Sequence, residues 1–152
     1  MNPFQAAVRD FHRVMDAPAP DRPKLDLSTY RFELRAKLIL EEALEFIDAC
    51  GCFAEVTPDD DDDGHYMTVD GPHETPNWSE MIDALCDIMY VTVGAAIEMG
   101  IDLQPFFDLV HEANMKKAAG PVREDGKKLK PPGWQPPDIQ GLLTTMLEKQ
   151  DG

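Results

Sequence analysis

Apolar and polar residues alternate along the chain in a way that predicts helices separated by loops. Apolar positions recur at spacings of three and four over several stretches, which is the pattern of a helix with one buried face. In the first stretch this face consists of Phe4, Val8, Phe11 and Met15. Ser28 or Thr29 is a suitable N-cap for the second stretch, and Ser79 for the third. We therefore expect helices over residues 3–15, 28–51, 79–100 and 103–117, with one or two further helical turns over 139–147.

Two segments lack this periodicity. Residues 51–77 contain the acidic run Asp59 to Asp63 together with several glycines and prolines, and residues 121–138 are rich in Lys, Gly and Pro. The first segment is predicted to be a solvated insertion loop with room for one short hairpin, and 121–152 a tail that wraps the helices. Because no repeat and no convincing pair of strands is evident, we expect a single all-α domain over residues 1–152, built as an antiparallel four-helix bundle.

Composition restricts the classes of function. The 152 residues carry 14 Lys and Arg against 29 Asp and Glu, a net charge of -15 that repels nucleic-acid polymers and anionic membranes. Three cysteines do not form a disulfide framework, and no stretch reaches the roughly 20 apolar residues that cross a bilayer. The N-terminal residues also lack the apolar core of a signal peptide. We expect a cytoplasmic protein without a nucleic-acid or membrane partner.

Acidic residues form two stripes at helical spacing. Glu41, Glu42 and Glu45 share one surface of the second predicted helix, and Glu80, Asp83 and Asp87 share one surface of the third. Like charges at these spacings destabilise a helix, and no basic residue lies between Glu41 and Asp48 or between Glu74 and His111.

Something other than a lysine or arginine must neutralise this charge. Mg²⁺ prefers carboxylate oxygens, so a magnesium site between the two helices is one interpretation, with Mn²⁺ as a substitute. The alternative is an acidic face in contact with water. Neither stripe contains histidine, which argues against a di-iron centre and against zinc.

The ordered motifs resemble those of the all-α nucleoside triphosphate pyrophosphohydrolase superfamily, which includes MazG, dimeric dUTPases and phosphoribosyl-ATP pyrophosphohydrolase. Glu41-Glu42-x-x-Glu45 followed by Glu80-x-x-Asp83 is similar to the metal-binding signature, and the segment from Asp83 to Gly94 to the core of the third helix. Residues 111–117 and 125–131 are similar to the nucleotide-contacting end of MazG-like members.

The resemblance implies an activity and roles for the acidic residues. It implies Mg²⁺ held by Glu42, Glu45, Glu80 and Asp83, with Glu41 orienting or deprotonating the attacking water, so Glu41 and Glu42 are the candidate catalytic residues. The implied reaction is hydrolysis of a (d)NTP to a (d)NMP and pyrophosphate, for cleansing of the nucleotide pool. A homodimer is expected as well, because the third helix is apolar nearly all round.

Six further residues are candidates for substrate binding, each with a structural alternative. Arg35 either contacts phosphate or pairs with a ligand carboxylate, and Asp87 is either a further ligand or a partner of Lys116 or Lys117. Asn114 either reads a base or sugar or caps a helix end. Lysines near the end of the fourth helix either clamp phosphate or aid solubility; these are Lys117, Lys127 and Lys130. The rival to an enzyme is a non-catalytic helical dimer that binds nucleotide or metal.

Overall fold

The computed structural model describes residues 1–58, 65–123 and 128–149, which form five helices and one two-stranded hairpin. In chain order the elements are α1 (Pro3–Val14), α2 (Thr29–Ala49), β1 (Phe53–Pro58), β2 (His65–Asp70), α3 (Trp78–Glu98), α4 (Leu103–Lys117) and α5 (Ile139–Glu148). Backbone contacts divide the chain into two compact units, residues 26–95 and residues 1–25 with 96–152.

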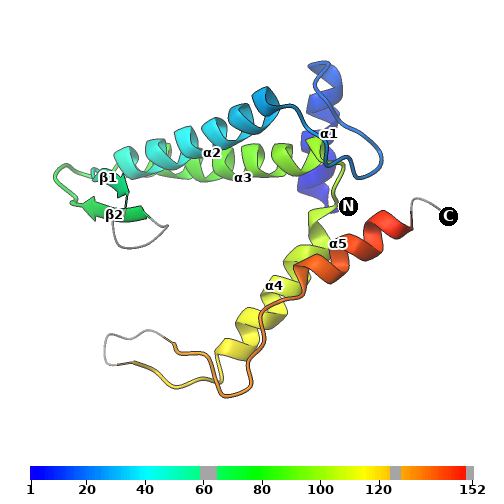
Figure 1. The fold of residues 1–152 in the computed structure, drawn as a ribbon. Coiled ribbons are helices and arrows are strands. Elements are labelled where there is room, and N and C mark those ends of the chain that lie inside the picture. The colour runs from blue at the N-terminus through cyan, green and yellow to red at the C-terminus, as the bar shows by residue number, and fades with distance from the viewer. Residues whose placement is uncertain (59–64, 124–127, 150–152) are drawn as a thin grey trace. The chain divides into compact units, whose positions relative to one another are not determined.

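The unit formed by residues 26–95 is a helical hairpin with a β-hairpin at its end. The helices α2 and α3 run antiparallel and side by side, and β1 and β2 lie in the connection between them (Figure 1). The two strands pair in antiparallel register, from Phe53 opposite Asp70 to Pro58 opposite His65. The hairpin therefore adjoins the end of α2 and the start of α3.

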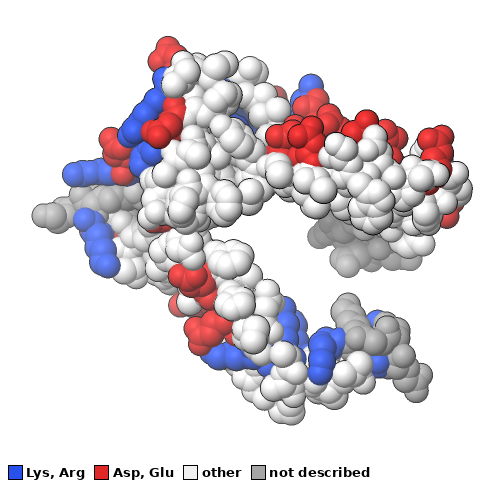
Figure 2. All heavy atoms as spheres, turned by 180° about the vertical axis from the view of Figure 1, so that it is seen from behind, with Lys and Arg blue, Asp and Glu red and all other residues white. Residues whose placement is uncertain are grey.

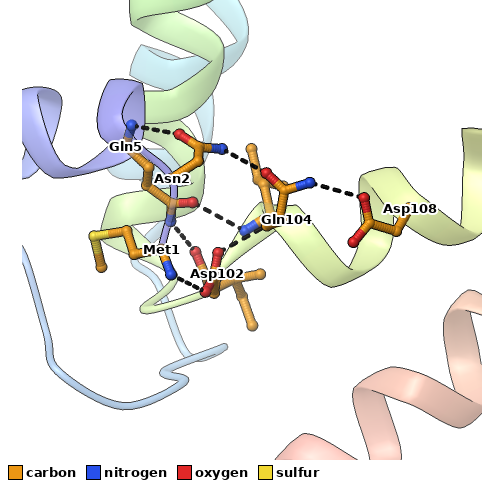
Figure 3. A network of polar contacts seen from close by, with 8 residues as sticks. Met1, Asn2, Gln5, Asp102, Gln104 and Asp108 are labelled. Atoms are coloured by element: carbon orange, nitrogen blue, oxygen red, sulfur yellow. Dashed lines mark hydrogen bonds and ion pairs between the residues drawn. The ribbon is translucent and has the colours of Figure 1, made fainter.

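The other unit contains α1, α4 and α5. The side chain of Gln5, only 1% exposed, joins α1 to the start of α4: its amide donates to the carbonyl of Ile101 at 2.5 Å and accepts from the Leu103 N–H at 3.0 Å. Asp102, the N-cap of α4, forms an ion pair of 2.7 Å with the Met1 ammonium group (Figure 3). The pKa of Asp102 lies below its ordinary value: burial opposes this shift, and hydrogen bonds from the Met1 ammonium and the Gln104 N–H outweigh it.

Helix starts follow a common rule in this chain. The side chain of an Asn or Asp accepts a backbone N–H from the first turn of four helices, at Asn2, Asn77, Asp102 and Asp138. Ser28 occupies the N-cap position of α2 but makes no such bond. The expectation that Ser79 caps the third helix is wrong, because Asn77 precedes it and supplies the oxygen for the N–H groups of Ser79 and Glu80.

The mostly helical prediction is confirmed, while the all-α prediction requires correction. The β-hairpin lies within the segment expected to be an insertion loop with room for one short hairpin, and the structure shows that hairpin; each strand is six residues long and largely exposed on both faces. The acidic run 59–63 lies outside the described residues. The antiparallel arrangement of α2 and α3 agrees with a bundle, and the complete four-helix bundle and the single domain stay predictions.

Burial differs from the sequence expectation in two helices. In α1 the buried residues are Gln5, Val8 and His12, whereas Phe4 and Phe11 are exposed. The helix α3 is apolar nearly all round, yet Ile82 and Leu85 in its first half are 62% and 51% exposed. Ala84 in the same half is buried, at 4% exposed, and most of the other buried residues of α3 lie toward its C-terminal end, among them Val93, Ala96 and Ile97. Among the described residues, no single helix is long and apolar enough to cross a membrane; α3 and α4 reach that length and composition only as a bent pair.

Candidate functional site

The two acidic motifs meet in one hollow of unit 26–95. Its lining comes from the last turns of α2 and the first turns of α3, namely Glu45, Asp48, Glu80, Asp83 and Ala84, around a volume of about 210 Å³. Figure 2 shows acidic side chains gathered over this helix pair. Because α2 and α3 run antiparallel, the C-terminal end of the first motif lies opposite the N-terminal end of the second. The structure therefore brings together three of the four predicted metal ligands.

Glu42, the fourth, interacts electrostatically with both helices. Burial, followed by the negative charges of Glu45, Asp87, Glu41 and Asp83, raises its pKa above the ordinary value of a glutamate. Two of these charges belong to α2 and two to α3. The two stripes therefore form one group of like charges, and Asp87 belongs to that group.

Glu41 differs from the other acids of its motif because it has a cation partner. Its carboxylate lies 3.3 Å from the ammonium group of Lys37, one turn earlier on α2. Both side chains are largely exposed, at 71% for Lys37 and 45% for Glu41, so the pair contributes little to stability. No basic residue follows Glu41 before Asp48, as noted from the sequence. Lys37, which precedes Glu41 by four residues, offsets part of the negative charge of the motif.

The donor set of the hollow fits a hard divalent cation. Four carboxylates line it, and oxygen donors of this kind are what Mg²⁺ prefers. Among the described residues, no group of three His, Cys, Asp or Glu side chains is gathered closely enough to hold a metal ion as it stands. Mg²⁺ retains several waters and binds through one or two carboxylates plus substrate phosphates, so this chemistry does not require a closed cage of side chains.

Asp48 is a lining residue that the motif pattern did not single out. It lies three positions after Glu45 on α2, a spacing that places both side chains on one helix face. The motif ends at Glu45, and Asp48 falls outside it. Extending the stripe by one further turn along α2 identifies this residue from the sequence.

Arg35 lies on α2 two turns before the acidic motif and is partly buried. Burial, followed by the positive charge of Arg31, lowers the pKa of its guanidinium group. Its predicted roles, phosphate contact or pairing with a ligand carboxylate, stay predictions.

The lysines predicted to bind substrate lie near the end of α4, in the other unit. The Lys117 ammonium lies 3.1 Å from Asn114 Oδ1 and 5.0 Å from the centre of the Trp134 ring, and the Lys130 ammonium lies 4.5 Å from the same ring centre. Trp134 itself donates its indole N–H to the carbonyl of Ala113 at 3.0 Å. Figure 2 shows basic side chains at this end of the helix.

This arrangement decides between some of the alternatives for α4. Asn114 lies inside the helix, whose C-cap is Ala118, so it is not a capping residue. Lys116 forms an ion pair of 2.7 Å with Glu112, whose pKa is lowered by the hydrogen bond and the charge of that ammonium. Among the described residues, neither Lys117 nor Lys130 is paired with a carboxylate. Lys127 lies outside the described residues.

An antiparallel helix pair that carries two carboxylate motifs around one hollow fits the class of all-α nucleotide pyrophosphohydrolases. The family model of phosphoribosyl-ATP pyrophosphohydrolase matches residues 8–114, and the chain belongs to this family. It is therefore a pyrophosphohydrolase, a hydrolase that acts on phosphoric anhydride bonds. The match includes both acidic motifs and ends before Lys117 and Trp134. A comparison with curated proteins gives no match.

Proposed function

We propose that the chain is a magnesium-dependent nucleoside triphosphate pyrophosphohydrolase that splits the α–β linkage of a (d)NTP to give a (d)NMP and pyrophosphate. The observation that carries this proposal is the hollow between α2 and α3, which is lined by Glu45, Asp48, Glu80 and Asp83 within the region that matches the family. A site so rich in carboxylates repels a polyphosphate unless a cation lies between them, so metal and substrate are expected to bind together.

The acidic residues have separate roles in this proposal. Glu42, Glu45, Glu80 and Asp83 hold the metal, and Asp48 adds an oxygen donor to the same hollow. When bound, Mg²⁺ neutralises phosphate charge and makes bound water more acidic.

Glu41 orients the attacking water and accepts its proton. The water oxygen forms a bond to the α or the β phosphorus, and the P–O bond between that phosphorus and the bridging oxygen breaks. Attack at the α phosphorus expels pyrophosphate and attack at the β phosphorus expels the nucleoside monophosphate, so the products are the same. The Glu41 carboxylate pairs with Lys37 on the exposed side of α2, a weak contact that leaves it able to bind water.

The residues outside the hollow serve the phosphates and the nucleoside. Arg35, two turns before the acidic motif on α2, contacts a phosphate or pairs with a ligand carboxylate, and Asp87 is a further member of the acidic group, as its effect on Glu42 supports. Lys117 and Lys130 contribute a basic patch that binds phosphate oxygens, and Lys127 is assigned to the same task by its position in the sequence. Asn114 reads the base or sugar through its amide.

Phosphoribosyl-ATP is the second candidate substrate, and the family match favours it. It also carries a triphosphate whose hydrolysis releases pyrophosphate, so the same carboxylates serve either substrate. A role in cleansing the nucleotide pool belongs to the first candidate. Comparison of the rates of pyrophosphate release from (d)NTPs and from phosphoribosyl-ATP distinguishes the two candidate substrates.

Self-association is part of the proposal. Large apolar side chains remain exposed along both helices of unit 26–95, including Phe32 at 52%, Leu40 at 56% and Ile82 at 62%. Isolated exposed apolar residues are common, but a series along two adjacent helices marks an interaction surface. A second copy of the chain is the proposed cover, which predicts a concentration-dependent dimer in sedimentation experiments.

The deciding experiment measures release of pyrophosphate and phosphate from canonical and damaged NTPs and dNTPs and from phosphoribosyl-ATP, with and without Mg²⁺. Glu42→Gln and Asp83→Asn are expected to abolish metal-dependent release. Glu33→Gln, on the exposed part of α2 outside the hollow, is the matched control and should retain it. Release of pyrophosphate from none of these compounds would contradict the proposal and favour a non-catalytic nucleotide- or metal-binding dimer.

A further inference from the structure

A second hollow lies beside the acidic one in unit 26–95. It has a volume of about 330 Å³, and its lining comes from the end of α2, the turn into β1 and the segment that precedes α3. Asp48 and Glu80 line both hollows, so the two share a border. Its lining also includes Gly51, Phe53, Glu74 and Asn77.

Backbone hydrogen bonds hold the walls of this second hollow. The N–H of Asn77 donates to the carbonyl of Ala49 at 2.8 Å, and the N–H of His73 donates to the carbonyl of Gly51 at 2.7 Å. Gly51 has a φ of 71°, and a Cβ atom added there would lie 2.5 Å from the backbone oxygen of Glu74. The close approach of these two segments therefore depends on glycine, and the hollow is preformed by backbone contacts rather than by loose side chains.

Charge decides which part of a nucleotide fits this hollow. Its lining includes three acidic side chains, Asp48, Glu74 and Glu80, and, within the described part of the chain, no lysine or arginine. A phosphate group is repelled there unless a cation accompanies it, whereas an uncharged base and sugar need no cation. Phosphates bound in the acidic hollow leave the nucleoside within reach of the adjoining one.

Phe53 supplies an aromatic surface at this hollow. Its side chain is 65% exposed, and its ring lies 5.5 Å from the His73 ring, centre to centre, with an angle of 32° between the planes. Every nucleobase has a flat face that stacks on an aromatic ring. An exposed phenylalanine at the start of β1, lining a polar hollow, is positioned for such stacking.

Polar groups complete the lining. The Asn77 side-chain oxygen is engaged by the N–H groups of Ser79 and Glu80, at 3.2 and 3.4 Å, which leaves its NH₂ group to donate elsewhere. The Glu74 carboxylate accepts hydrogen bonds. One donor and one acceptor of this kind suit the edge of a base or the hydroxyls of a sugar.

We propose that the second hollow is the nucleoside subsite, in which Phe53 stacks on the base while Asn77 and Glu74 bind its polar edge or the sugar. The β-hairpin thus contributes directly to substrate recognition. This inference rests on the proposed function, since it places the nucleoside beside phosphates held in the acidic hollow.

The test compares two exposed aromatic residues of the same hairpin. Phe53→Ala should raise the KM for the best nucleotide substrate roughly tenfold, as expected for the loss of one stacked base, with little change in kcat. Tyr66→Ala on β2 is the matched control, because Tyr66 is also 65% exposed but does not line the hollow. The inhibition constant of inorganic tripolyphosphate, which has no nucleoside, should be the same in both variants and in the unaltered protein.

A binding measurement separates this inference from the catalytic proposal. Saturation-transfer NMR with free nucleosides should give a signal that Phe53→Ala abolishes and Tyr66→Ala retains, whether or not any nucleotide is hydrolysed. An unchanged KM and an unchanged signal in Phe53→Ala would overturn the inference. Equal losses in both variants would overturn it too, because they would trace the effect to the hairpin fold rather than to the Phe53 ring.

Discussion

The backbone N–H of Asn77 donates a hydrogen bond of 2.8 Å to the carbonyl of Ala49, the last residue of α2. This bond ties the end of the helix that carries the first acidic motif to the residue that precedes the second. The side chain of Asn77 caps α3 at the same point. Asn77 thus fixes the first residues of α3 through its side chain and their position beside the end of α2 through its backbone. This position brings Glu80 and Asp83 to the same hollow as Glu45.

Loss of the cap is expected to destabilise α3. Asn77→Ala retains the backbone bond but leaves the N–H groups of Ser79 and Glu80 without their acceptor, at a cost of about 1 kcal/mol. For a chain of this size the thermal midpoint should fall by roughly 2–4 °C. Asn77→Ser keeps a capping oxygen and should remain close to the unaltered protein. Equal midpoints for the Ala and Ser variants would contradict the assigned cap.

The acidic group predicts a stability that depends on pH in the absence of metal. Because the pKa of Glu42 is raised in the folded state, protonated Glu42 stabilises the fold at low pH, and this contribution is lost as pH rises through the raised pKa. Without Mg²⁺, the thermal midpoint should therefore fall across that range. Addition of Mg²⁺ should reverse the fall, because a cation replaces the proton. Thermal unfolding at several pH values, with Mg²⁺ or with EDTA, measures both effects.

Glu42→Gln isolates this effect. Each like-charge pair costs a few tenths of a kcal/mol, so without metal at neutral pH the variant should unfold roughly 1–2 °C higher than the unaltered protein. The midpoint should also rise less when Mg²⁺ is added. A variant that loses activity while becoming more stable indicates that the charge is retained for function. A variant that is less stable in EDTA would show that the charges do not repel one another as inferred.

Trp134 is predicted to position two lysines for phosphate binding. Its ring faces the ammonium groups of Lys117 and Lys130, and each cation–π contact is worth about 0.5–1 kcal/mol at an exposed site. Trp134→Leu should weaken pyrophosphate binding by roughly two- to fivefold for each lysine released. The inhibition constant of pyrophosphate, determined at fixed ionic strength, is the quantity to measure.

Two variants accompany this measurement. Trp134→Phe keeps an aromatic face but loses the hydrogen bond to the Ala113 carbonyl, so it should retain part of the affinity. Lys149→Ala removes one positive charge at the end of α5 and should leave pyrophosphate binding unchanged. If Lys149→Ala weakens binding as much as Trp134→Leu does, general charge rather than the ring explains the affinity.

The sequence predicted the helices and the acidic stripes because both depend on local spacing. A spacing of three or four residues fixes the face on which Glu42, Glu45 and Asp83 lie, whatever the rest of the chain does. The extent of α4, from Leu103 to Lys117, likewise follows from the Asp102 cap and the apolar pattern before Gly120.

The second hollow, by contrast, depends on contacts between distant residues. No local pattern places Glu74 against Gly51, or Phe53 beside Asp48, because these contacts arise only when the hairpin folds back on the helices. The aromatic surface of Trp134 was missed for the same reason: it meets Lys117 through a turn of the tail. The sequence shows a glycine at position 51 but does not show that its φ is positive.

Gln5 is predicted to stabilise the unit that lacks the acidic motifs. It is polar but only 1% exposed, and its side chain satisfies the carbonyl of Ile101 and the N–H of Leu103. Gln5→Leu has a similar size but leaves both backbone groups without a partner, at a cost of about 2–3 kcal/mol. Gln5→Glu keeps an acceptor for Leu103 but cannot donate to Ile101 and places a charge in a buried site, so its loss should be larger. Urea unfolding measures both variants, with Gln140→Leu on the exposed surface of α5 as control. If Gln5→Leu unfolds at the same urea concentration as the unaltered protein, these buried hydrogen bonds do not hold α1 to the start of α4.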